Sequence, residues 1–156
     1  MINENINRMI DLSMRKKQYL MELLDLTQKQ GTIIEEEKLD ELDKILKEKD
    51  KVMEKVDELD SQFLSIFNQI KDEEKIDDFE KLPVEKYENV KELKAIIGEI
   101  NNILNSLSIL DKNNIAKMKA KVEETQAQLK NIRMAKKANK GYGLGDIGSV
   151  FLDEKK

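Results

Sequence analysis

Apolar side chains recur at steps of three and four along most of this 156-residue chain, which is the period of an α-helix. The pattern predicts three long helices, over about residues 2–35, 39–71 and 84–140. In the first, the apolar stripe consists of Ile6, Met9, Ile10, Leu20, Leu23, Leu24 and Ile34. The chain then reverses between Gly31 and Lys38. Gly31 weakens a helix and favours an early break, whereas the apolar pair Ile33–Ile34 continues the stripe and favours a late one.

The second predicted helix has the most regular apolar stripe, in which steps of three and four alternate over four heptads. The stripe consists of Leu42, Ile45, Val52, Val56, Leu59, Phe63, Ile66 and Ile70. Lys49 occupies the one position of this seam that has no apolar side chain. A sustained heptad is typical of coiled-coil packing, so this helix has to pair with another helix to bury its seam.

The third predicted helix follows a connection over residues 71–88, which contains the only proline. Pro83 suits either the first turn of a new helix or a loop. The helix repeats the seam at Val90, Leu93, Ile97, Ile100, Leu104 and Leu107. Asp111 and Asn114 take the next two seam positions, which indicates a kink, a turn that splits the helix, or a polar layer that fixes the register. We favour a helix that continues through this stretch but is locally weak.

Beyond Asn114 the apolar stripe resumes, shifted by one residue and with fewer large side chains per turn. It consists of Met118, Val122, Leu129 and Ile132. Residues 141–156 are of a different kind, because they hold four of the six glycines. Gly141 is a natural helix stop, and we expect a flexible tail after it. The apolar Tyr142 and Phe151 suit a tail that orders on a partner, one that packs back on its own bundle, or one without a role.

The pattern as a whole predicts an all-α fold: an elongated, antiparallel, coiled-coil-like bundle of three long helices over residues 1–140, with a flexible tail over residues 141–156. The composition adds exclusions, since the chain has no His and no Cys. Disulfides, metal sites built on those residues, and catalytic units with a His base are therefore excluded. Only Asp111 places a carboxylate on the seam, and the tail glycines lack the sequence of a phosphate cradle. The sequence predicts no metal, no cofactor and no enzyme activity.

The net charge of −4 conceals two regions of opposite sign. Residues 35–60 hold twelve carboxylates and six lysines, whereas residues 112–140 hold nine Lys or Arg and two Glu. These are either ordinary solvated helix faces, or the basic end meets an acidic partner or a membrane surface. The mild net acidity argues against nucleic-acid binding. Without an apolar run of membrane-spanning length or a signal peptide, we expect a cytoplasmic protein with no stable membrane insertion.

Four features of the chain, taken in order, match a known family. The first helix leads through LLDLTQKQGTIIEEEKLDELDKILKEKDKVMEKVDELD into the second, with Lys49 inside it, and the second contains the aromatic stretch DSQFLSIF. The third helix contains the basic stretch NNIAKMKAKVEETQAQLKNIRMAKKANK. The tail places a tyrosine before glycines in KGYGLGD and ends in FLDEKK. In this order and over nearly its whole length, the chain resembles the FlgN-type flagellar export chaperones.

The resemblance implies a cytoplasmic, non-enzymatic chaperone for hook-associated proteins of the hook–filament junction. Such a chaperone prevents premature assembly of its clients and delivers them to the gate of the flagellar type III export apparatus. The resemblance also implies that the C-terminal helices of the clients bind at Met118, Val122, Leu129 and Ile132. The family's tail tyrosine, associated with docking at the export gate, corresponds to Tyr142. The residues alone leave two other functions open: a structural homo-oligomeric coiled-coil spacer, and a helical regulatory adaptor.

Overall fold

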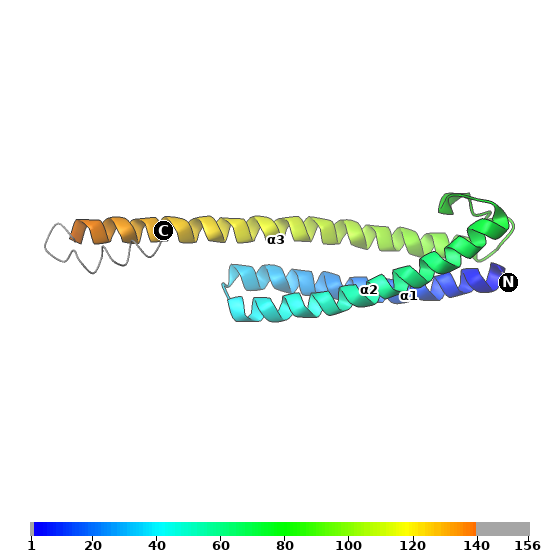
Figure 1. Cartoon of the computed structure of the whole chain (residues 1–156), viewed down its shortest axis with the longest axis horizontal. Coiled ribbons are helices and arrows are strands. Elements are labelled where there is room, and N and C mark those ends of the chain that lie inside the picture. Colours follow the sequence, from blue (N-terminus) through cyan, green and yellow to red (C-terminus); the bar gives the residue numbers. More distant parts are fainter. Residues whose placement is uncertain (1, 140–156) are drawn as a thin grey trace. The chain divides into compact units, whose positions relative to one another are not determined.

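A computed structural model describes residues 2–139, which are mostly helical (Figure 1). The elements are α1 (Ile2–Glu35), α2 (Leu39–Glu74), the 3₁₀ turn η1 (Phe79–Lys81) and α3 (Val90–Asn139). No strand occurs between residues 2 and 139, so the predicted all-α class with three long helices is confirmed. The chain divides into two units, residues 1–114 and residues 115–156. Tyr142 and the rest of the predicted tail lie outside the described residues.

The turn between α1 and α2 falls late, as the apolar pair Ile33–Ile34 indicated. Gly31 lies inside α1 and is buried there, so it does not end the helix. The reversal is made instead by Glu37, whose φ of 58° places it in the left-handed region. The Lys38 N–H donates to the Ile33 carbonyl over 3.1 Å, which satisfies one of the carbonyls left open at the end of α1.

The third helix begins later than the sequence predicted, at Val90 and not at residue 84. The helix α2 ends at Glu74, since Lys75 adopts a left-handed conformation with φ of 55°. Pro83 lies in the loop, where its carbonyl accepts the Tyr87 N–H over 3.3 Å. The Tyr87 carbonyl in turn accepts the Val90 N–H over 3.2 Å. The backbone before Val90 therefore closes turns, and these replace the first helical turns that the pattern predicted.

Glu74 anchors this connection to the end of α2. The Tyr87 hydroxyl donates a hydrogen bond to the Glu74 carboxylate, and Lys86 Nζ lies 3.0 Å from Glu74 Oε1. The hydrogen bonds from Tyr87 and then from Lys86 lower the pKa of the Glu74 carboxyl below its ordinary value. The charged form of Glu74 is thus the one that holds the connection in place.

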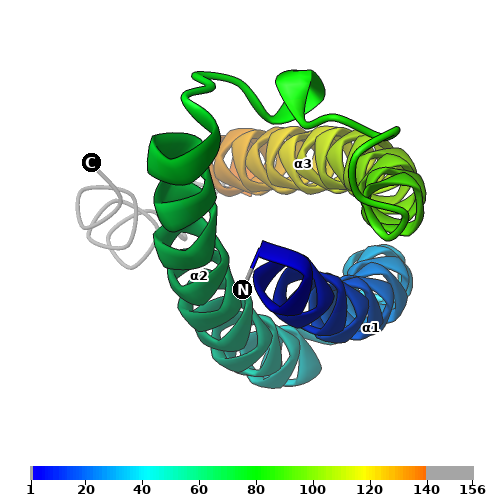
Figure 2. The same cartoon turned by 90° about the vertical axis from the view of Figure 1, so that its right-hand side faces the viewer.

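Two apolar clusters form the interior of the first unit, and both draw side chains from α1, α2 and α3. The first consists of Ile6, Met9, Ile10, Leu12, Leu59, Ile66, Ile70, Leu82, Val90 and Leu93. The second consists of Leu20, Leu23, Leu26, Ile45, Val52, Val56, Ile100 and Leu107. The connection crosses one end of the bundle from α2 to α3 (Figure 2). There Phe79 packs edge-on against Phe67, with 5.8 Å between ring centroids, and Leu82 is buried.

A polar layer joins the three helices near the end of the first unit. Asn114 is buried, and its Nδ2 donates to the Thr27 carbonyl of α1 over 2.9 Å. Lys49 of α2 donates to Gln30 Oε1 over 2.7 Å and lies 3.4 Å from Asp111 Oδ1. The residues that interrupt the seams of α2 and α3 therefore meet one another. The helix α3 runs through this stretch without a break, so no turn splits it.

The buried amide of Asn114 should contribute measurably to stability. We expect Asn114→Ala to lower the free energy of unfolding by about 1 kcal/mol, because the hydrogen bond to Thr27 is lost. Asn113→Ala is the matched control, since Asn113 is exposed, and its effect should stay within about 0.5 kcal/mol. Urea denaturation followed by circular dichroism measures both values. Equal effects of the two substitutions would show that the polar layer adds no stability.

The Glu74 anchor should make the contribution of Tyr87 depend on pH. Because the pKa of Glu74 is lowered in the folded chain, its stabilisation is present at neutral pH and is lost as the pH falls through that lowered pKa. We therefore expect Tyr87→Phe to lower the melting temperature at pH 7 and to have a smaller effect well below about pH 4. Thermal unfolding of both chains at the two pH values checks this. A difference that stays constant would contradict the assignment.

Candidate partner-binding surface

The four residues that the sequence singled out in the third helix share one face of α3. Met118 and Leu129 are half-buried, whereas Val122 and Ile132 are 47% and 49% exposed. Successive spacings of four, seven and three keep all four on one side of a helix. No residue between 115 and 139 is buried, so the described part of the second unit has no core of its own.

The face has a fifth member, Ile115, which was not among the residues predicted from the sequence. Ile115 is 68% exposed and lies three residues before Met118 and seven before Val122. The spacing could have revealed it, but Ile115 directly follows the polar residues that interrupt the seam. We refer to these five residues as the α3 stripe: Ile115, Met118, Val122, Leu129 and Ile132.

Basic side chains lie on both flanks of the α3 stripe: Lys117 and Lys121 directly precede stripe residues, and on the opposite flank Glu123 follows Val122 among further basic residues. Residues 115–139 contain seven Lys or Arg and two Glu. Lys119, Lys130 and Arg133 each directly follow a stripe residue, so each lies roughly 100° further around the helix on the same flank. The arrangement is that of an amphipathic helix with a basic border, which suits a partner that is apolar along its centre and acidic at its edge.

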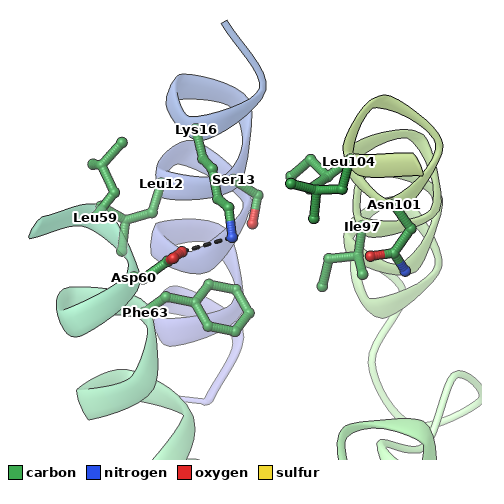
Figure 3. A pocket seen from close by; sticks show the side chains of 10 residues that line it. Leu12, Ser13, Lys16, Leu59, Asp60, Phe63, Ile97, Asn101 and Leu104 are labelled. Carbon is green, nitrogen blue, oxygen red and sulfur yellow. Dashed lines mark ion pairs between the residues drawn. The ribbon is translucent and has the colours of Figure 1, made fainter. Parts of the chain in front are cut away.

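The first unit has a second apolar surface, a groove between α2 and α3 whose floor is α1. A cavity of about 170 Å³ lies in it. The lining comprises Leu12, Ser13 and Lys16 of α1, Leu59, Asp60 and Phe63 of α2, and Ile97, Ile100, Asn101 and Leu104 of α3. Ile97 and Leu104 point across the gap toward α1 and α2 (Figure 3). Lys16 Nζ pairs with Asp60 Oδ1 over 2.7 Å, as the dashed line marks.

This α2–α3 groove was not predicted, because its lining residues lie on the same seams that pack the helices together. The apolar pattern shows that Leu59 and Ile97 face inward, but it does not show where two neighbouring helices stand apart. The groove is open to solvent, since Leu104 on its α3 side is 40% exposed.

Residues 2–139 contain neither a candidate metal site nor a candidate membrane span. Within that range no three acidic side chains gather closely enough to bind a metal ion. The same range contains no helix that combines the length and the apolar character needed to cross a bilayer. What the described structure offers is two apolar surfaces on helices, the α3 stripe and the α2–α3 groove.

Comparison with known proteins gives one match. A family model described as "FlgN protein" matches residues 1–145, which include all three helices and every residue of both surfaces. No curated protein and no solved structure matches the chain. A match over this much of the length, together with three helices and an exposed amphipathic stripe, establishes the relationship. The chain belongs to the FlgN family of flagellar export chaperones.

Proposed function

We propose that this chaperone binds hook-associated proteins of the hook–filament junction in the cytoplasm through the α3 stripe. It thereby prevents their premature assembly and delivers them to the export gate. The observation that carries the proposal is an amphipathic helix face without a core partner, in a chain that belongs to the FlgN family. Binding of this kind needs no catalytic group, so the protein acts as a carrier and not as an enzyme.

The stripe suits a client that is itself helical. A client's amphipathic C-terminal helix can lay its apolar face along the stripe, as in other helix-in-groove complexes. Burial of each large apolar side chain contributes about 1.5–3 kcal/mol before costs. Association and the ordering of the client remove much of that gain. The expected affinity is micromolar, which lets the client be released at the gate.

The basic flank adds selectivity to this contact. Lys119, Lys130 and Arg133 would meet acidic residues at the edge of the client helix. Because these side chains are at the surface, salt should weaken the attraction. The contact is thus expected to favour acidic clients and to lose affinity as the ionic strength rises.

Removal of two stripe residues should abolish client binding. We expect Leu129→Ser with Ile132→Ser to weaken the complex by about 100-fold or more, because two large apolar side chains are lost. Calorimetric titration with a peptide from the C-terminal end of a hook-associated protein measures this. Met134→Ser is the matched control: Met134 is 60% exposed on the same helix, but roughly 200° around it from Ile132.

Two outcomes would contradict the placement of the client surface. One is wild-type client affinity in the double variant. The other is a homo-oligomer so tight that it keeps the stripe covered even at saturating client, which would favour the spacer function instead.

Tyr142 is proposed to act in docking at the export gate and not in client binding. We expect Tyr142→Ala to leave the client affinity unchanged and to reduce secretion of hook-associated proteins. The first is measured by the same titration and the second by the amount of client in the culture medium. A variant that weakens the client complex instead would show that the two tasks are not separated in this way.

A further inference from the structure

The α2–α3 groove of the first unit has the form of a helical bundle that lacks one helix. α1 supplies its floor, whereas α2 and α3 supply its walls (Figure 3). Phe63 and Ile97 on the two walls are half-buried, and Leu104 is 40% exposed. In a four-helix bundle, a further helix packs between two such walls and covers side chains of this kind.

The apolar surface of the groove continues along α2 on both sides of the cavity. Met53 lies seven residues before Asp60 of the groove, Leu46 lies seven residues before Met53, and Leu64 lies four residues after Asp60. Spacings of four and seven keep all of them on the groove side of α2. Leu46, Met53 and Leu64 are 42%, 40% and 57% exposed. The surface from Leu46 to Leu64 is about 27 Å long, which matches a partner helix of about five turns.

The α3 wall of the groove carries no charge. Residues 100–110 contain no charged side chain, although 38% of the residues in the chain are charged. Its polar residues are neutral: Asn101 lines the groove, and Ser108 lies seven residues further along the same side of α3. Depletion of charge is typical of the centre of a protein–protein interface, where an unpaired charge would lose its hydration. This wall therefore has the composition of a surface that another protein covers.

The outer border of the α2 wall is acidic. Asp43, Asp50 and Asp57 are spaced by seven and are all exposed. Asp50 precedes Met53 by three residues, which places it about 60° around α2 from Met53. Lys47 pairs with Asp43 over 3.0 Å, but neither Asp50 nor Asp57 forms an ion pair with any residue of the described range. The groove thus has a row of carboxylates along one side.

The nearby lysines of α2 do not extend into the groove from this border. Lys44 and Lys51 directly follow two of the row's carboxylates, so they lie roughly 100° further around the helix, away from Met53. Inside the groove, Lys16 of α1 already pairs with Asp60 over 2.7 Å. The negative charge of the border is therefore left for a partner to neutralise.

These features together define the chemistry of the missing helix. It has an apolar stripe for the centre of the groove, Lys or Arg along the flank that follows α2, and neutral residues along the flank that follows α3. We propose that the α2–α3 groove binds such a basic-flanked amphipathic helix of another protein, with its stripe over Met53 and Leu104 and its basic flank along Asp50 and Asp57. This is a second binding site in addition to the client surface of the α3 stripe.

A second copy of the first unit fits this groove less well. A two-fold contact along α2 would bring the acidic rows of both copies together, and like charges across an interface weaken association. The partner is therefore a different protein that supplies the opposite charge.

Binding of a synthetic helical peptide to the full chain tests the proposal. The probe has 18 residues, with leucines along one stripe, lysines along one flank, and Ala and Gln elsewhere. Fluorescence anisotropy of the labelled peptide measures its affinity. Met53→Lys with Leu104→Lys should weaken binding by at least about 100-fold, because two apolar contacts are lost. Ile109→Lys is the matched control and should bind as the wild type does. Ile109 is 61% exposed, but lies roughly 140° around α3 from Leu104 and outside the groove.

The acidic border is tested by substitutions that leave the apolar surface intact. Asp50→Asn with Asp57→Asn should weaken binding of the lysine peptide by about fivefold at low salt, because two surface ion pairs are lost. The difference from the wild type should vanish at about 1 M salt, where charges on the surface are screened. A loss caused by misfolding would persist at high salt.

Four results would overturn the proposal. The first is a wild type that does not bind the lysine peptide. The second is binding that the Met53→Lys, Leu104→Lys variant retains. The third is binding that the two Asp→Asn changes leave unaltered at low salt. The fourth is a wild-type dimer in sedimentation equilibrium that the Met53→Lys, Leu104→Lys variant converts to a monomer, because the occupant would then be a second copy.

Failure of this inference can be told apart from failure of the proposed function. The groove variants keep the α3 stripe, so they should bind the client peptide as the wild type does. The Leu129→Ser, Ile132→Ser variant keeps the groove, so it should bind the lysine peptide as the wild type does. Loss of lysine-peptide binding in this stripe variant would place the peptide on the stripe and overturn the groove site.

Discussion

Burial of one apolar stripe per helix is the interaction on which the rest of this protein depends. A helix with a single seam is marginal in water, so α1, α2 and α3 hold their form in the first unit by covering one another. The two apolar clusters that result take side chains from all three helices. Side chains such as Leu20, Ile70 and Leu93 are almost fully buried, although charged residues make up 38% of the chain.

The polar layer marks where this shared interior ends. Asn114 and Lys49 place hydrogen-bonding groups on two seams, and their partners Thr27, Gln30 and Asp111 come from the neighbouring helices. A buried amide tolerates few alternative neighbours, because an unsatisfied group costs free energy. The layer therefore fixes how α3 is aligned with α1. Past it, the same helix carries apolar side chains, none of which is buried.

That division connects the fold to the task of a FlgN-family chaperone. A carrier has to hold an apolar helix of its client and release it again. It therefore needs an apolar face that is not buried in its own core. We propose that the α3 stripe is such a face, whose sparse side chains would limit the affinity. An exposed stripe is also a risk of self-association.

The sequence by itself determined the helices, their seams and the stripe at Met118, Val122, Leu129 and Ile132, because helical spacing is a local property. It left the first turn open between Gly31 and Lys38, and the structure places the turn late, at Glu37. The sequence placed the start of the third helix at residue 84, since the apolar pattern does not show that Pro83 and Tyr87 close turns. Only the tertiary structure decided that the polar seam residues meet in one layer and that a groove opens between α2 and α3. Both depend on the distances between helices, which side-chain packing sets and which no single helix encodes.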